Sequence, residues 1–227
     1  MTKPLAWSFS SLDDFTNCPR AYYEKKVAKS VKEEESDAML WGTRVHKMFE
    51  DRQKFGLEKA PLPADMVVHE IQMYNQEILP GEFQTEQKFG LDATLQPCGF
   101  FDKTVWMRGI IDYVKINCDE ALIVDYKTGK THNKYKQLAL FALYVFAKYP
   151  DVTKVKVKFY WVQAALTSGK DYTRDMIAEL WGFFVPNLRQ YMEAFKTDTW
   201  QPRPSGLCNG WCPVKTCEFW KPKRIGK

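Results

Sequence analysis

The chain has 227 residues, of which 45% are hydrophobic and 27% charged, and this balance excludes a disordered, fibrous or membrane protein. At this length folding buries about 70% of the unfolded chain's surface, so a core forms without disulfides and we expect a single domain over residues 1–227. The sequence opens without the apolar run of a signal peptide, so we expect a reducing cytoplasm and no membrane contact. A net charge of +5 permits a polyanionic partner without requiring one.

The first third of the chain predicts helices. Ser10 and the acids after it are typical of a helix start, and the step Cys18-Pro19 predicts a kink or a restart. A charged connection at residues 32–35 precedes a second helix over residues 38–55. The apolar spacing of this helix directs four side chains inward: Leu40, Val45, Met48 and Phe49.

The rest of the chain predicts strands mixed with helices. After a proline breaker at 61–63 and a short helical piece, strand patterns occupy residues 83–89, 104–116 and 121–127. A strongly apolar helix follows over 134–149, then a strand at 155–161 whose alternating lysines we interpret as a solvated face. The last amphipathic helix spans 174–195 with a bend at Pro186, and a tail from 201 to 227 holds three cysteines. This order predicts an α/β fold with a central mixed sheet flanked by helices.

Two of the predicted strands carry an acidic pair. A hairpin that turns symmetrically about Cys118 and Asp119 places Asp112 opposite Asp125, with their Cβ atoms about 4.5–5.5 Å apart. Two carboxylates this close repel by about 3 kcal/mol at an effective dielectric of 20, so either one binds a proton or a cation lies between them. Magnesium is the commonest such cation, and Lys127 shares the face of Asp125. A salt-bridged surface hairpin is the alternative.

Four segments, in order, resemble the RecB-like branch of the PD-(D/E)XK nuclease superfamily, especially the iron-sulfur DNA exonucleases of CRISPR adaptation systems and their phage relatives. These segments are residues 10–22, 42–46, 109–130 and 137–140. The resemblance implies a restriction-endonuclease-like core over about 38–165, with the cysteine-rich tail packed on the N-terminal helix. It also implies exonucleolytic hydrolysis of DNA ends in recombination, repair or phage genome processing, in a bacterial cytoplasm or a phage-infected host cell.

The resemblance assigns a metal site and a catalytic lysine. The residues His46, Asp112 and Asp125 correspond to the family's ligands of Mg²⁺ or Mn²⁺, and the carbonyl oxygen of Tyr126 corresponds to a further ligand. Lys127 corresponds to the catalytic lysine, which supports the attacking water and the charged transition state.

Further site residues follow from the same resemblance. Glu86 resembles the acidic residue that helps to arrange the site, with a surface glutamate as the alternative. Gln137 matches the glutamine of a Q-x-x-x-Y motif whose tyrosine position is Phe141 here, and Tyr144 is the candidate to replace that hydroxyl. Weaker candidates for phosphate contacts are Arg20, Lys130 and Lys134.

Four of the six cysteines match a one-plus-three arrangement. Cys18 and the tail residues Cys208, Cys212 and Cys217 correspond to the ligands of a 4Fe-4S cluster in the resembling nucleases. The tail spacing departs from the usual form, with three and then four intervening residues in place of two and five. A zinc site would use the same residues, and a site without metal is the third alternative. We expect Cys98 and Cys118 to be ordinary residues.

Two other functions compete with a DNA nuclease. One is a non-catalytic DNA-binding or scaffolding module with a structural metal cluster, which would act beside recombination or replication proteins. The like-charge pair beside Lys127 argues against it, because a binding module has no need of such a pair. The other is an RNA nuclease, which the sequence does not exclude. The sequence also leaves the polarity of digestion, the preference for single- or double-stranded ends and the oligomeric state undetermined.

Overall fold

The computed structural model describes residues 4–32, 35–132 and 135–222. The chain divides into two compact units, which are described separately: a terminal unit of Met1–Glu35 with Phe184–Lys227, and a central unit of Ser36–Phe183. The single domain over residues 1–227 stays a prediction, because this division does not test whether the units fold independently. Within the described residues, no helix has the length and apolar character needed to cross a membrane.

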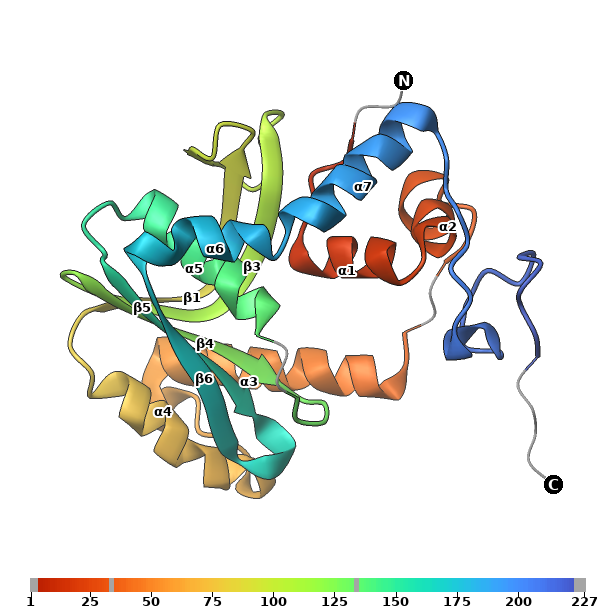
Figure 1. The fold of residues 1–227 in the computed structure, drawn as a ribbon. Helices are drawn as coiled ribbons and strands as arrows, with labels where there is room; N and C mark the ends of the chain where they lie inside the picture. Colours follow the sequence, from red (N-terminus) through yellow and green to blue (C-terminus); the bar gives the residue numbers. More distant parts are fainter. Residues whose placement is uncertain (1–3, 33–34, 133–134, 223–227) are drawn as a thin grey trace. The chain divides into compact units, whose positions relative to one another are not determined.

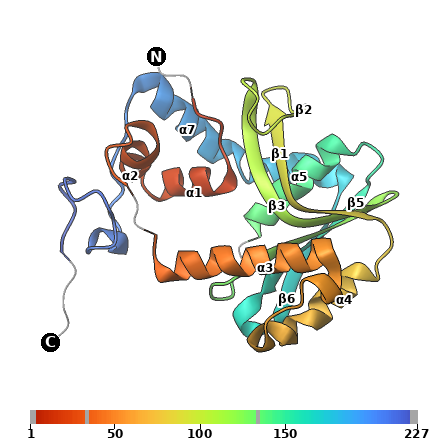
Figure 2. The ribbon, with the colours of Figure 1, turned by 180° about the vertical axis from the view of Figure 1, so that it is seen from behind.

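The central unit is built on a mixed sheet whose six strands, among the described residues, lie in the order β2-β1-β3-β4-β5-β6 (Figures 1 and 2). Strands β4 and β5 are parallel and every other neighbouring pair is antiparallel. The strands are β1 (Glu82–Asp92), β2 (Pro97–Cys98), β3 (Val105–Asn117), β4 (Glu120–Lys127), β5 (Lys154–Trp161) and β6 (Leu166–Thr173). The predicted α/β class with a mixed sheet is confirmed.

Helices cover both faces of this sheet (Figure 1). On one side α3 (Asp37–Lys59), the 3₁₀ helix η2 (Ala64–His69) and α4 (Glu70–Glu77) enclose an apolar cluster that includes Phe49, Met73, Tyr113 and Tyr126. On the other side lie α5 (Lys136–Lys148) and α6 (Ile177–Gly182). Short 3₁₀ turns η3 (Val162–Ala164) and η4 (Arg174–Met176) flank β6.

Helix α3 forms where its apolar spacing predicts, but one of the four side chains expected to be buried is exposed. The Ser36 side chain accepts the backbone N–H of Met39 and so satisfies one donor at the helix start. Val45 and Phe49 are buried and Met48 packs against the apolar cluster. Leu40 is 48% exposed, so its predicted inward position is wrong: it precedes Trp41, the first α3 residue that packs on the cluster.

The three strands predicted before residue 130 are present, and β5 matches the alternating pattern at 155–161. In the β3–β4 hairpin, Asn117 pairs with Glu120 and Tyr113 with Val124, so the predicted register is confirmed. Two strands were not predicted. Strand β2 has only two residues, and the sequence of β6, LTSGKDYT, has no alternation of apolar residues. On β5, Lys154 and Lys156 form ion pairs with Glu120, as a solvated face would.

The terminal unit contains α1 (Phe9–Asn17), α2 (Pro19–Tyr22), the π-helix η1 (Tyr23–Val27), α7 (Val185–Thr197) and the 3₁₀ turn η5 (Gly206–Cys208). Helix α1 begins earlier than predicted, because Ser8 rather than Ser10 is the N-cap and accepts the N–H of Ser11. The restart at Pro19 is confirmed. In its core the hydroxyls of Tyr22 and Tyr191 are 2.8 Å apart.

The predicted helix over 174–195 is wrong as a single helix. It consists of α6 and α7, and the chain leaves helical order at Phe183 and Phe184 rather than bending at Pro186. Pro186 lies in the first turn of α7, where its missing N–H costs nothing, so the proline begins a helix instead of bending one.

Candidate active site

The first group of site residues gathers where α3 meets β1 and β3. His46 on α3, Glu86 on β1 and Asp112 on β3 each offer a ligand atom, and these three atoms lie within 4.8 Å of one another. The Nδ1 atom of His46 is 3.2 Å from Oδ1 of Asp112. Glu86 and His46 also line an open pocket with Gly42 and Thr43. One imidazole and two carboxylates are a suitable ligand set for a divalent cation.

The charges of this group are strongly coupled. Burial opposes protonation of His46, but the hydrogen bond that the imidazole donates to Asp112 and the charges of Asp112, Asp125 and Glu86 raise the pKa of His46 above its ordinary value. Burial and the negative charge of Asp112 raise the pKa of the Glu86 carboxyl. A bound cation would relieve this repulsion between carboxylates, which is the electrostatic argument for a metal at this position.

The second group closes a triangle on the end of β4. Nζ of Lys127 lies 2.6 Å from Oδ2 of Asp125 and donates a hydrogen bond of 2.8 Å to Oε1 of Gln137 on α5. Nε2 of Gln137 in turn donates to Oδ1 of Asp125 at 3.0 Å. Burial raises the pKa of Asp125 to about 7, although the charge of Lys127 opposes that rise. The triangle therefore fixes the lysine ammonium beside a carboxylate that is almost fully buried.

The backbone of Tyr126 joins the two groups. Its N–H donates a 2.7 Å hydrogen bond to Oδ2 of Asp112, which leaves Oδ1 of that carboxylate directed to His46. The β3–β4 pairing ends at Tyr113 and Val124, so this side-chain contact continues the hairpin one step beyond its last backbone pair.

A glycine allows α3 to approach this region closely. An ideal Cβ built on Gly42 would lie 3.2 Å from Oγ1 of Thr128, which is closer than side chains normally pack. Gly42 lies one helical turn before His46, so the absence of a side chain there lets this part of α3 approach the residue that follows β4.

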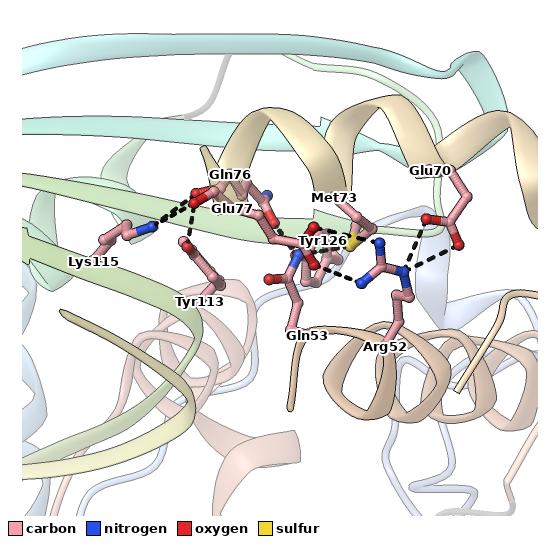
Figure 3. Close-up of polar contacts among 9 residues, drawn as sticks. All are labelled: Arg52, Gln53, Glu70, Met73, Gln76, Glu77, Tyr113, Lys115 and Tyr126. Carbon is pink, nitrogen blue, oxygen red and sulfur yellow. Dashed lines mark hydrogen bonds and ion pairs between the residues drawn. The ribbon is translucent and has the colours of Figure 1, made fainter. Parts of the chain in front are cut away.

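The side chain of Tyr126 reaches a buried polar network between α3, α4 and the sheet (Figure 3). The Tyr126 hydroxyl donates to Oε1 of Gln76 at 3.0 Å, and Nε2 of Gln53 donates to the same oxygen at 2.6 Å. Nζ of Lys115 donates to the carbonyl oxygens of Gln76 and Glu77 at the end of α4. Arg52 is 3% exposed and its guanidinium contacts the carboxylates of Glu70 and Glu77. The strand that carries Asp125 and Lys127 is thus bonded to α4.

The structure describes three of the four remaining predicted residues. Lys130 is exposed in the loop after β4, and Lys134 lies outside the described residues. Arg20 belongs to the terminal unit and forms an ion pair of 2.8 Å with Glu24. Tyr144 stacks on Phe89 with ring centres 4.1 Å apart and bonds to Lys148, so its contacts differ from those of the triangle.

The four predicted cysteines line one pocket of the terminal unit. Cys18, at the start of α2, faces Cys208, Cys212 and Cys217 of the tail, so the predicted packing of the tail on the N-terminal helices is confirmed. Backbone N–H groups of Arg203 and Ser205 lie 3.4 Å and 3.5 Å from the sulfurs of Cys18 and Cys208. Burial raises the pKa of the Cys212 thiol, and the other three cysteines act in the same direction.

Four thiols that line one pocket could together hold a metal group. A 4Fe-4S cluster and a zinc ion both take four thiolate ligands. The residues of this pocket therefore fit either group.

Two features of this region go beyond the sequence prediction. Glu86 was expected to help arrange the site rather than to offer a ligand atom, and the network behind Tyr126 was not predicted. Glu86 has a positive φ of 48°, which departs from regular strand geometry, so alternation along β1 could not have placed its side chain.

Comparisons with known proteins bear on the family and the fold. The model of the PD-(D/E)XK nuclease superfamily matches residues 6–217. A structure named "Putative exonuclease" from Eubacterium rectale covers 93% of this chain and 85% of its own, with 16% identity and a TM-score of 0.54, so the two are similar in fold. The structure of SSO0001 covers 96% of this chain and 88% of its own at 14% identity, and its TM-score of 0.42 is too low to indicate a shared fold. No curated protein matches the chain.

Proposed function

The chain belongs to the PD-(D/E)XK nuclease superfamily, and we propose that it is a metal-dependent deoxyribonuclease that hydrolyses phosphodiester bonds from DNA ends. One observation carries the proposal: the ligand group of His46, Glu86 and Asp112 is joined through Tyr126 to the triangle that holds Lys127. Nucleases of this superfamily use divalent metals, and the donor set of the ligand group suits one.

In this proposal each residue has a distinct role. His46, Asp112 and Glu86 would hold Mg²⁺ or Mn²⁺, which supplies charge stabilisation at the phosphate and an activated water. Asp125 and the carbonyl oxygen of Tyr126 are further proposed ligands. Each oxygen of Asp125 has one contact, with Lys127 or Gln137, and keeps a further lone pair that could ligate a cation. The ammonium of Lys127 would orient the water and stabilise the negative charge that develops during attack.

The more specific parts of the proposal have separate support. Action from DNA ends, and a role in recombination, repair or phage genome processing, follow from the sequence resemblance to exonucleases. We assign a 4Fe-4S cluster to the four cysteines of the terminal unit because they line one pocket and match the one-plus-three arrangement of the resembling nucleases, with zinc as the alternative. Arg20, Lys130 and Lys134 remain proposed phosphate contacts.

The direct test is digestion of end-labelled linear and closed circular DNA, in single- and double-stranded forms, by anaerobically purified protein with Mg²⁺ or Mn²⁺. We expect loss of linear DNA alone, abolished by EDTA and by Lys127→Ala. Lys156→Ala, a matched removal of an ion-paired lysine on β5, should cut at the wild-type rate. Folded, metal-loaded protein that binds DNA without cutting it would instead support a DNA-binding module. Matched RNA oligonucleotides test the remaining alternative.

A further inference from the structure

Two neighbouring phenylalanines, one partly buried and one exposed, lie at the turn between β2 and β3. Phe101 is 77% exposed, the largest exposed fraction among the large apolar side chains of the described residues. Its ring contacts that of Phe100, with centres 4.8 Å apart and planes at 77°. The accessible face of this ring is a surface on which a planar group could stack.

Two cations accompany the rings. Nζ of Lys88 on β1 lies 5.8 Å from the centre of the Phe101 ring, and the guanidinium carbon of Arg108 on β3 lies 5.0 Å from that of Phe100. Lys88 pairs with Ile110 and Gly90 pairs with Arg108, so both cations project from the same face of the β1–β3 ribbon. Among the described residues, neither cation has a carboxylate within ion-pair distance.

Two acidic residues near this turn, Asp92 and Asp102, accept hydrogen bonds from backbone N–H groups. Oδ2 of Asp102 accepts the backbone N–H of Gly99, and Oδ1 of Asp92 accepts the backbone N–H groups of Thr94 and Gln96. These carboxylates shape the turns and leave Lys88 and Arg108 available to an external anion. We call Phe100, Phe101, Lys88 and Arg108 the aromatic–basic patch.

The patch continues the strands that carry the ligand group. Lys88 is two residues from Glu86 along β1, and Arg108 is four residues from Asp112 along β3. At about 3.3 Å per residue these separations are about 7 Å and 13 Å along the ribbon. A single strand whose end lies at the ligand group therefore reaches the patch within a few nucleotides.

We propose that the aromatic–basic patch binds single-stranded DNA next to the active site: a base stacks on Phe101, and Lys88 and Arg108 contact the phosphates. This rests on the proposed nuclease function and deepens it by assigning a preference for unpaired ends. Bases inside a duplex are already stacked and do not offer a face to Phe101, whereas unpaired bases of any sequence do. The two cations contact the backbone of either form.

The test is the affinity of the full-length protein for a fluorescent oligonucleotide, single-stranded or annealed as a blunt duplex, measured by anisotropy in EDTA so that no cutting occurs. Phe101→Ala should weaken single-strand binding about 5-fold to 150-fold, the range for one lost base–aromatic stack, and leave duplex binding unchanged. Phe101→Trp, which keeps an aromatic ring, should retain single-strand binding, whereas Phe101→Leu, which does not, should weaken it. Phe55→Ala removes another exposed phenylalanine of the central unit and should have no effect.

The cations have their own expected signature. Lys88→Gln should weaken both forms and reduce the slope of log affinity against log salt by about 0.7 for the single strand, the value for one phosphate. Equal loss of single-strand and duplex binding in Phe101→Ala, or no loss, would overturn the stacking role. Parallel digestion with Mn²⁺ separates the two proposals. If the wild-type protein cuts DNA but Phe101→Ala leaves single-strand affinity unchanged, the patch proposal alone is rejected. If Phe101→Ala weakens single-strand binding but the wild-type protein cuts no DNA, the nuclease proposal alone is rejected.

Discussion

At the scale of single residues, Asp112 has the most constrained position in the site. One carboxylate oxygen faces His46 and the other accepts the Tyr126 N–H, so this side chain belongs to the ligand group and also holds β4 in place. Asp112→Asn keeps the shape but removes the charge. We expect Mn²⁺ affinity, measured by calorimetry, to fall at least about 10-fold, because a carboxylate is a far better ligand than an amide.

The matched control for Asp112→Asn is Asp151→Asn, which removes an exposed aspartate before β5. It should bind Mn²⁺ as the wild type does. If both variants retained full affinity, the ligand group would not be the metal site.

Site residues could be placed from the sequence only where the backbone around them is regular. Asp112 and Asp125 could be placed because the hairpin is regular and its two-residue turn lies between Asn117 and Glu120. Gln137 could be named only from its motif, since nothing in local pattern predicts that it bridges Asp125 and Lys127 across an intervening loop. The left-handed conformation of Glu86 has no signature in a single sequence.

At the scale of elements, the network behind Tyr126 predicts a measurable coupling between α4 and β4. Gln76→Leu removes the oxygen that accepts hydrogen bonds from Tyr126 and Gln53, and leaves these two buried donors only the weakly accepting Sδ of Met73. Poorly satisfied buried donors cost up to about 1–3 kcal/mol each, so urea unfolding should show a loss of at least about 1 kcal/mol. Asn75→Ala, on the exposed side of α4, should change stability little.

A double-mutant cycle distinguishes this hydrogen bond from general damage to α4. Tyr126→Phe removes the donor, so the loss in the double variant with Gln76→Leu should be smaller than the sum of the two single losses. Strict additivity would show that the 3.0 Å contact contributes nothing to stability.

The contact between η2 and β5 predicts a pH dependence. Nδ1 of His69 lies 2.6 Å from the Tyr160 hydroxyl in a buried position, and burial lowers the pKa of His69. Below an unfolded pKa of about 6.5 the unfolded chain takes up a proton that the folded chain resists. The contribution of His69 to the free energy of unfolding is therefore complete above this pH and is lost as the pH falls below it.

His69→Gln tests this pH dependence, because it keeps an acceptor for Tyr160 and removes the titrating group. The difference in free energy of unfolding between wild type and variant should shrink from pH 7.5 to pH 5. Taking this difference cancels the opposite contribution of His46, whose pKa is raised. A difference that stayed constant over this range would show that His69 is protonated equally in both states.

Helices and strands could be predicted from the sequence wherever one buried face gives the apolar residues a regular spacing. Helix α3, helix α5 and the β3–β4 hairpin have such periods, whereas β6 has mostly exposed positions and no pattern to read. The break at Phe183 and Phe184 was not predicted because its flanking residues continue a helical spacing. Its local signal is Pro186, which has no N–H to donate to the carbonyl oxygen of Gly182 and so separates α6 from α7.

At the scale of the whole molecule, the terminal unit brings together the two ends of the chain. Cys18 and the tail cysteines are separated by most of the sequence but line one pocket, so a cluster bound there would constrain the unfolded chain strongly. Cys212→Ala should lose iron and acid-labile sulfide and lower the melting temperature by about 5–10 °C. Cys118→Ala, in the exposed turn after β3, should lose neither.

The same variant tests whether residues 1–227 form a single domain. If the chain unfolds as one cooperative unit, loss of the cluster lowers the global free energy of unfolding, and the most protected amides exchange faster everywhere by the same factor. Hydrogen exchange in Cys212→Ala should then accelerate equally in peptides from β3 and β4 and in peptides from α1 and α7. Acceleration confined to α1 and α7 would mean that the central unit, which holds His46, Asp112 and Lys127, has a stability of its own. In that case the cluster could not influence cutting through the stability of the active site, and any effect of Cys212→Ala on activity would have to arise from contacts with DNA.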